Sequence, residues 1–181
     1  MLRIMFGCYK NKAIKLPRDL GVRPTLVRAR RMIFDIIRYE YNNVFTFLDV
    51  FAGSGIMGLE SLSNGASKVI FFDINKKVIR NLKDNIQSMP NIQGTYSIIC
   101  TSALTPPEGS PIDIIFIDPP YDKYFIAEDV IKKLYKKNWI NENTLIILEL
   151  PKKNTFDINQ FNIIREKTIS SSIFKFLKMK V

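Results

Sequence analysis

Short, nearly continuous apolar runs alternate with amphipathic segments from residue 45 of this chain onward. An apolar run without polar alternation is typical of a strand buried on both faces, and such strands build parallel sheets that helices cover on each side. The sequence therefore predicts an α/β fold. The expected strands are 45–51, 69–74, 96–100, 112–117 and 145–150.

Amphipathic periodicity in the intervals predicts the covering helices. Apolar residues recur at helical spacing in 56–63, 75–89 and 125–137. An earlier helix is expected to start near Pro24, with Thr25 as its N-cap. Two strand-like runs, 161–165 and 173–180, predict that the parallel sheet ends in an antiparallel hairpin, and 3–16 is expected to form a short hairpin or an extended arm.

Length and composition indicate one folded domain. A chain of 181 residues with 46% hydrophobic and 24% charged residues matches ordinary globular usage. There is no apolar run of the ~18 residues that a transmembrane helix needs, and no signal-peptide pattern. Two widely spaced cysteines, Cys8 and Cys100, indicate reduced thiols and a cytoplasmic location. The absence of histidine excludes His-dependent hydrolase triads and ordinary zinc catalysis.

Basic residues are concentrated near the N-terminus. Residues 1–38 contain ten Lys and Arg against two Asp, a net charge of +8, whereas the whole chain carries +10. Lys and Arg that neutralise phosphates release counterions and so gain affinity for nucleic acid. Within a single domain 1–181, the sequence therefore predicts a basic N-terminal extension (1–38) that binds a polyanion and a catalytic core (39–181). A solvated basic face without a partner is the alternative.

A glycine-rich loop follows the first expected strand directly. Gly53, Gly55 and Gly58 form G-x-G-x-x-G at the opening of the expected helix 56–63. In this context the motif is typical of a nucleotide-binding turn. Asp73, twenty residues after Gly53, ends the second strand, where its carboxylate can accept hydrogen bonds from both hydroxyls of a ribose. The pattern predicts a cofactor that contains a nucleoside.

The charge of Asp49 distinguishes between two cofactor classes that use such a loop. A dinucleotide would place its pyrophosphate over the loop, beside this carboxylate of like charge. S-adenosylmethionine instead carries an ammonium and a sulfonium group, and Asp49 at the strand end can attract the ammonium. Charge therefore favours S-adenosylmethionine, and a tight turn that only joins strand to helix is the structural alternative.

The strand 112–117 runs into Asp118-Pro119-Pro120-Tyr121. The two prolines have no N–H, so this corner presents acceptors at the sheet edge where α/β proteins bind ligands. Asp118 and the Pro119 carbonyl can accept the two N–H bonds of an exocyclic amine and direct its lone pair at a sulfonium methyl. Tyr121 can stack on the base. A surface turn is the alternative, since Asp and Pro are turn residues.

Together these segments resemble the class I S-adenosylmethionine-dependent methyltransferases that act on exocyclic amines of bases. A narrower resemblance, to the bacterial 16S rRNA guanine-N2 methyltransferases of the small subunit, is carried by Arg3-Ile4 with Gly7, Lys15-Leu16-Pro17, Arg23-Pro24-Thr25, Arg28, Arg30, 49–60 and 118–121. It implies a Rossmann-like fold with a seven-stranded, mostly parallel sheet and a small basic extension. It also implies S-adenosylmethionine as cofactor and 16S rRNA, in the small subunit or its assembly intermediate, as partner. We expect a monomer without a metal ion.

The motifs and the resemblance define three sets of candidate residues. The catalytic set is Asp118, Pro119, Pro120 and Tyr121. The cofactor set is Asp49, Phe51, Gly53, Ser54, Gly55, Gly58, Asp73, Ile74, Ser102 and Ala103. The RNA-binding set is Arg3, Lys10, Lys12, Lys15, Arg23, Thr25, Arg28, Arg30 and Arg31.

Several positions depart from the pattern of that family. Phe6 stands where a glycine is usual, and Asn11-Lys12 where a basic residue and a glycine are usual. Arg31 replaces an acidic residue, which makes the helix more basic. Ser102 is shorter than the polar side chain that often contacts the adenine amino group.

Other functions stay open at this stage. The Asp-Pro-Pro-Tyr corner serves adenine as well as guanine, so a DNA adenine-N6 methyltransferase is the alternative enzyme. Sequence readout on DNA normally needs a recognition domain that buries about 1,000 Å² or more, for which the short basic extension leaves little room. A non-catalytic RNA-binding assembly factor could keep the fold, but the intact loop and corner argue against it. A nicotinamide oxidoreductase is a third alternative.

Overall fold

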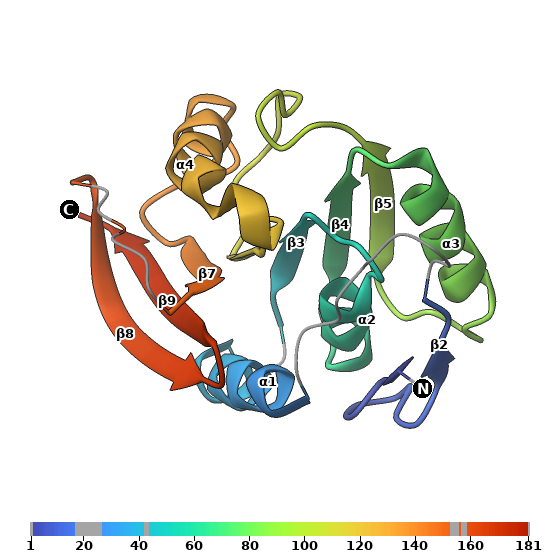
Figure 1. The fold of residues 1–181 in the computed structure, drawn as a ribbon. Coiled ribbons are helices and arrows are strands. Elements are labelled where there is room, and N and C mark those ends of the chain that lie inside the picture. Colours follow the sequence, from blue (N-terminus) through green and yellow to red (C-terminus); the bar gives the residue numbers. More distant parts are fainter. Residues whose placement is uncertain (1, 17–26, 42–43, 153–155, 157–158, 181) are drawn as a thin grey trace.

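The computed structural model describes residues 2–16, 27–41, 44–152, 156 and 159–180, and within them seven strands form one central sheet (Figure 1). The strands are β3 (Thr46–Val50), β4 (Lys68–Asp73), β5 (Thr95–Cys100), β6 (Ile114–Ile117), β7 (Leu145–Pro151), β8 (Phe161–Ile169) and β9 (Ser172–Met179). Their order across the sheet is β5, β4, β3, β6, β7, β9, β8. The strands β3 to β7 pair in parallel, whereas β9 is antiparallel to β7 and β8. This confirms the predicted parallel sheet with a C-terminal antiparallel hairpin.

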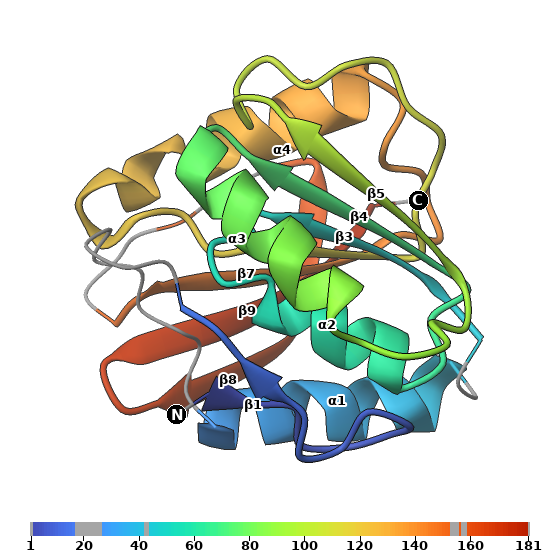
Figure 2. The same ribbon diagram turned by 90° about the vertical axis from the view of Figure 1, so that its right-hand side faces the viewer.

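Helices cover both faces of the sheet. On one face lie α1 (Val27–Tyr41), α2 (Ile56–Ser63) and α3 (Lys76–Gln87), and on the other lies α4 (Ala127–Lys136), which follows the 3-10 helix η1 (Tyr121–Ile126) (Figure 2). Successive strand side chains point to alternate faces. In β3, accordingly, Phe47 belongs to the core under α1 and α2, and Leu48 to the core under α4. Two covered faces explain why the central strands are apolar throughout.

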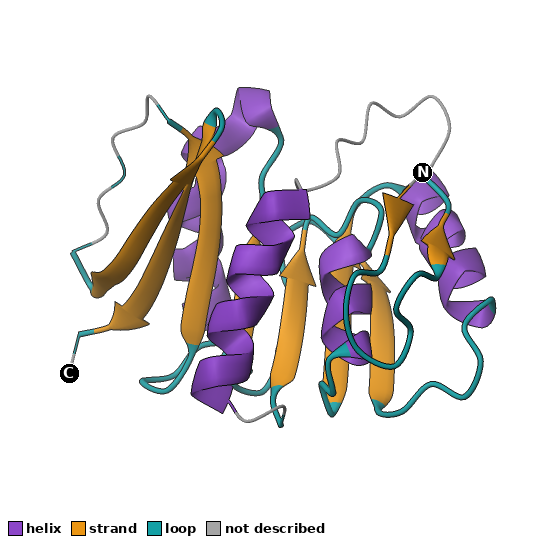
Figure 3. Ribbon diagram, turned by 90° about the horizontal axis from the view of Figure 1, so that it is seen from below, coloured by secondary structure: helices purple, strands orange, loops and turns teal. Residues whose placement is uncertain are grey.

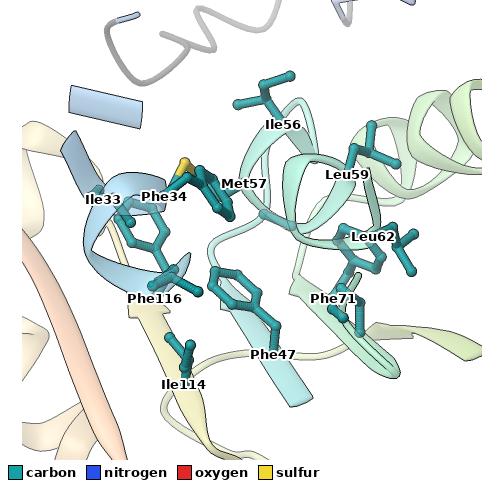
Figure 4. Close-up of a cluster of buried hydrophobic side chains, with 14 of the residues drawn as sticks. Ile33, Phe34, Phe47, Ile56, Met57, Leu59, Leu62, Phe71, Ile114 and Phe116 are labelled. Atoms are coloured by element: carbon teal, nitrogen blue, oxygen red, sulfur yellow. The ribbon is translucent and has the colours of Figure 1, made fainter. Parts of the chain in front are cut away.

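Aromatic side chains fill both cores. The ring centroids of Phe34 and Phe47 are 6.5 Å apart, and Figure 4 shows Met57 of α2 next to Phe34 of α1. On the opposite face, Phe72 and Trp139 meet edge to face at 5.3 Å. Such pairs stabilise a core beyond the area that they bury.

The strand expected at 96–100 is not buried on both faces. It corresponds to β5, which lies at the edge of the sheet, and Tyr96 is 43% exposed. An edge strand has a neighbour on one side only, so its side chains are less covered than those of central strands. Two other elements are longer than predicted. The helical segment expected at 125–137 starts at Tyr121 with η1, and the strand expected at 161–165 is β8, which continues to Ile169.

The N-terminal residues form a short hairpin that is fastened to the core. Strands β1 (Leu2–Arg3) and β2 (Ala13–Ile14) pair antiparallel, and the hairpin lies beside α2 and α3 (Figure 3). The Tyr9 N–H donates to Oγ of Ser63 in α2 at 2.9 Å. Lys15 and Asn85 of α3 exchange two hydrogen bonds, each of 2.9 Å. The basic extension is thus docked on the catalytic core in this part of its length.

Three smaller expectations can be compared with the fold. Within the described residues, no helix combines the length and apolarity needed to cross a bilayer. Cys8 and Cys100 are exposed free thiols. The expected N-cap, Thr25, lies outside the described residues.

Candidate active site

A cavity of about 600 Å³ opens at the carboxyl ends of the parallel strands. It lies where β3, β4, β6 and β7 end, which is the edge at which open α/β sheets bind ligands. The glycine loop and the Asp-Pro-Pro-Tyr corner therefore face the same space. The expected catalytic and cofactor residues on its wall are Asp49, Phe51, Gly53, Ser54, Asp73, Ile74, Ser102, Ala103, Asp118, Pro119, Pro120 and Tyr121.

Backbone N–H groups orient the Asp73 carboxylate at the end of β4. The Gly53 N–H donates to Asp73 Oδ2 at 3.0 Å, and the Asn75 N–H donates to Asp73 Oδ1 at 2.8 Å. A carboxylate can accept about four hydrogen bonds, so each oxygen keeps capacity for a further donor. Asp73 is therefore suited to a ligand with two neighbouring hydroxyls.

Gly55 and Gly58 lie outside the cavity wall and act through packing instead. Gly55 has φ of +76°, and a Cβ there would lie 2.2 Å from Cδ1 of Leu82. A Cβ on Gly58 would lie 2.1 Å from Cε1 of Phe71. Glycine at these two positions lets α2 start immediately after the loop and approach the sheet closely.

Asp49 is buried beneath the loop, with 2% of its surface exposed. Its Oδ2 accepts a hydrogen bond from the Gly58 N–H at 3.0 Å. Burial raises the pKa of Asp49 to about 8. The hydrogen bond from Gly58 lowers this pKa, and the negative charge of Asp73 raises it. A cation beside Asp49 would stabilise the ionised carboxylate, so this end of the cavity favours a cationic group.

The chain turns at residues 118–121, directly after β6. Pro119 is buried, whereas Pro120 and Tyr121 are exposed. The Lys123 N–H donates to the Pro120 carbonyl at 2.7 Å, which fixes the turn into η1. The Tyr121 side chain is 71% exposed at the cavity wall and can stack on a flat ligand. The corner thus combines acceptors with an aromatic face.

Ser102 and Ala103 lie in the loop after β5. The Oγ of Ser102 accepts a hydrogen bond from the Leu104 N–H at 3.2 Å, and Ala103 is buried. A serine hydroxyl has two acceptor lone pairs, so one remains for a further donor such as the amino group of an adenine. Ser102 lies on the cavity wall, so its hydroxyl is within the space where the predicted contact with an adenine would form.

Comparisons with known proteins place this chain among methyltransferases. The family model described as "Conserved hypothetical protein 95" matches residues 2–178. The chain belongs to this family. The ribosomal RNA small subunit methyltransferase D of Haemophilus influenzae is 33% identical over 172 residues, which cover 92% of this chain and 88% of the relative. The Escherichia coli protein of the same name is 28% identical over 155 residues and covers 84% and 76%.

Solved structures agree with this assignment. The Escherichia coli protein yhhF superposes with a TM-score of 0.83 at 26% identity, over 99% of this chain and 98% of that chain. The present chain is accordingly a methyltransferase with the class I fold, as the motif resemblance predicted.

The residues expected to contact RNA in this family member differ in their surroundings. Five of them are exposed: Arg3, Lys10, Lys15, Arg28 and Arg31. Two brace the hairpin, since the Arg3 guanidinium donates to the Asn11 carbonyl at 2.6 Å and the Lys12 ammonium donates to the Ser88 carbonyl. Arg23 and Thr25 lie outside the described residues.

Arg30 was expected to bind RNA, and the structure contradicts this. Its side chain is 1% exposed, and its Nη1 lies 2.8 Å from Oε1 of the buried Glu60. The same Nη1 donates to the Arg3 carbonyl at 3.0 Å, and the Met5 N–H donates to Glu60 Oε1 at 2.8 Å. Burial lowers the pKa of Arg30 and raises that of Glu60, while their mutual attraction opposes both shifts. The pair joins α1, α2 and the N-terminal hairpin.

Glu149 is a cavity residue that the sequence analysis does not include. It is half-buried near the end of β7 and lines the cavity together with Asp118. A signal was present in the sequence, because Glu149 is the only charged residue in the apolar strand Leu145–Pro151. Burying a carboxylate among apolar side chains costs free energy unless it forms hydrogen bonds or ion pairs, so its presence there indicates a role in the site.

Proposed function

We propose that this chain transfers a methyl group from S-adenosylmethionine to the exocyclic N2 amine of a guanine in 16S rRNA, within the small ribosomal subunit or its assembly intermediate. The observation that carries the proposal is that the acceptor-only corner at Asp118 and Pro119 lines the same cavity as the glycine loop and its acids. Relatives named ribosomal RNA small subunit methyltransferase D support RNA as the substrate class.

The charges of the cavity fit S-adenosylmethionine. Asp73 is oriented for the ribose hydroxyls, and the buried Asp49 for the ammonium group. The volume of about 600 Å³ lies within the ordinary range for cofactor pockets. When bound there, S-adenosylmethionine supplies an electrophilic methyl group on a sulfonium.

The corner prepares the target amine for attack. Asp49 pairs in register with Phe116, two residues before Asp118 on the neighbouring strand, so both acids point to the same face at the cavity. Asp118 and the Pro119 carbonyl accept the two N–H bonds of the amine, which direct its lone pair and stabilise the positive charge that develops on nitrogen. After transfer the nitrogen is acidic and releases its proton to water, so no histidine base is needed.

Methyl transfer to ribosomal particles tests this function. Small subunits from cells that lack this enzyme are incubated with the protein and labelled S-adenosylmethionine, and their 16S rRNA is digested to nucleosides. We expect label in N2-methylguanosine from a single site. Label in adenine of duplex DNA, with none in the particles, would overturn the RNA substrate.

The proposed substrate also bears on organisation and location. We propose that the basic extension (1–38) and the core (39–181) work as one domain, because Tyr9 and Lys15 hydrogen-bond to α2 and α3. A substrate in the ribosome supports a cytoplasmic location.

Affinity for S-adenosylmethionine is expected to rise with pH as Asp49 ionises. Because the pKa of Asp49 is raised to about 8 in the unliganded protein, a cation that binds the carboxylate must release a proton below that pH. We expect the affinity to increase up to roughly tenfold per pH unit between about pH 6 and 8, and then to level off. Isothermal titration at several pH values measures this slope.

Asp49→Asn provides the control, since the amide oxygen can still accept from the Gly58 N–H. The variant should bind S-adenosylmethionine weakly and show a flat pH profile. Its unliganded form should also keep stability that the wild type loses between about pH 4 and 8, because ionisation of Asp49 is harder in the folded than in the unfolded chain. An equal pH slope in both proteins would show that another group titrates.

Neutralising four of the exposed basic residues of the extension is expected to weaken RNA binding. In the variant Lys10→Ala/Lys15→Ala/Arg28→Ala/Arg31→Ala, each lost phosphate contact should reduce the slope of log affinity against log salt by roughly 0.7–0.9. Binding to small subunits is measured from low to moderate salt. Lys133→Ala/Lys136→Ala removes exposed charges from α4 on the opposite face and should leave the slope unchanged. An unchanged slope in the first variant would place the RNA surface elsewhere.

A further inference from the structure

Glu149 lies beside Asp118 on the neighbouring strand. Strands β6 and β7 pair in parallel, with Phe116 opposite Ile147 and Ile117 opposite Leu148. β6 ends at Ile117, and continuing its register by one residue sets Asp118 opposite Glu149, at the spacing of about 4.8 Å between neighbouring strands. Phe116 and Ile147 share the core under α1 and α2, so the alternation of side chains directs Asp118 and Glu149 to that same face, and both line the cavity.

The backbone holds Glu149 firmly at this place. The residue pairs with Phe174 of β9 on one side and lies next to β6 on the other. Its neighbours in the strand, Leu148 and Leu150, are buried in the core under α4. The Glu149 carboxyl group therefore has little freedom to leave the cavity wall, and it presents hydrogen-bond acceptors there when it is ionised.

The edges of the nucleobases respond differently to a second acceptor beside Asp118. In guanine, ring atom N1 carries a hydrogen next to the N2 amine, so two neighbouring groups donate. In adenine and cytosine, the ring nitrogen next to the exocyclic amine carries a lone pair instead. A carboxylate that faces this ring position gains a charge-assisted hydrogen bond from guanine and meets repulsion from adenine or cytosine.

We propose that Glu149 selects guanine by accepting the hydrogen bond of its N1–H, while Asp118 and the Pro119 carbonyl hold the N2 amine. This inference rests on the proposed methylation of an exocyclic amine and adds the residue that decides which base is accepted. It also explains why an Asp-Pro-Pro-Tyr corner, which suits adenine equally well, would reject adenine in this protein. Sites that must hydrogen-bond a substrate group discriminate strongly against an analogue that lacks it.

The base analogue 2-aminopurine isolates this interaction. It keeps the exocyclic amine at C2 but has a lone pair at N1. This lone pair would face the Glu149 carboxylate, so binding for methylation would be opposed by repulsion between the two acceptors. After the methylated position is mapped, small subunits are reconstituted with 16S rRNA that carries guanine or 2-aminopurine at that position. The ratio of kcat/KM for the two substrates is measured for the wild type and for Glu149→Gln.

We expect the wild type to prefer guanine by roughly 10²-fold, and Glu149→Gln to reduce this preference at least about tenfold, because its amide can donate to the lone pair at N1. The two substrates also differ at C6, but that difference is the same in both enzymes and cancels in the change of the ratio. S-adenosylmethionine affinity should not change. Glu142→Gln, an exposed acid before the opposite end of β7, is the matched charge control and should keep the wild-type ratio.

The outcomes separate this proposal from the proposed function. If the wild type methylates no rRNA, the function itself fails. If the wild type methylates guanine and 2-aminopurine equally well, the role of Glu149 is overturned, even if the variant does not fold. An equal loss for both substrates in Glu149→Gln would also overturn it, since that result indicates a structural role.

Discussion

Replacing Asp118 by Asn is expected to lower kcat for methyl transfer by roughly 10²–10³-fold, the usual cost of removing one preorganised electrostatic contact to a transition state. The carboxylate accepts an amine N–H and faces the positive charge that grows on the attacking nitrogen. An amide is isosteric but uncharged, and it can also turn a donor toward the amine. The loss should therefore appear in kcat more than in substrate binding.

The position of Asp118 makes a clean measurement possible. The turn is fixed by the hydrogen bond from the Lys123 N–H to the Pro120 carbonyl and by the buried Pro119, neither of which involves the Asp118 side chain. Single-turnover transfer to small subunits is measured together with the affinities for S-adenosylmethionine and for the particle. The exposed Asp129 of α4 serves as the control, as Asp129→Asn. Wild-type rates in Asp118→Asn would refute the catalytic assignment.

Replacing Arg30 by Met is expected to destabilise the fold by about 3–5 kcal/mol, because it leaves the buried carboxylate of Glu60 without its charged partner. Arg30 and Glu60 are 1% and 0% exposed, so solvent cannot take the place of the guanidinium. The free energy of unfolding from urea titrations measures the effect. The N-terminal hairpin should also loosen, since Nη1 of Arg30 holds the Arg3 carbonyl.

The double variant Arg30→Met/Glu60→Gln distinguishes a buried ion pair from an RNA contact. The Gln oxygen can still accept from the Met5 N–H, and no buried charge remains, so at least half of the lost stability should return. A double-mutant cycle gives the coupling between the two residues. If Arg30→Met keeps full stability and loses RNA affinity instead, the original expectation from the sequence would be correct for Arg30.

The charge pattern of α1 predicts a basic segment but does not predict which of its arginines is buried. The helix α1 carries Arg28, Arg30 and Arg31 close together in its first turns, and all three contribute equally to the basic character of residues 1–38. In an α-helix, adjacent residues point about 100° apart, so one of them can face the core while the others face solvent. The acid that makes burial of Arg30 tolerable, Glu60, is thirty positions away in α2, and local periodicity contains no information about such a partner.

The glycine motif likewise predicts the loop but not the packing of each glycine. Its spacing after a buried strand predicts the loop, and Gly53 and Asp73 do meet through a hydrogen bond. The packing role of Gly55 and Gly58 depends on their contacts with Leu82 and Phe71, which only the folded structure shows. These contacts depend on how helices pack on the sheet, which a motif does not specify.

Sequence patterns alone predict the order and type of the main elements, the parallel sheet with its antiparallel end, and the two motifs that meet at one edge. These follow from hydrophobic periodicity, from glycine and proline stereochemistry, and from the rule that parallel strands end at a common edge. Three features could be learned only from the folded chain: Arg30 is buried, β5 is an edge strand, and Glu149 shares the cavity wall with Asp118. Each of these depends on register and packing between segments distant in the chain, and those are set by the global minimum of free energy rather than by any local pattern.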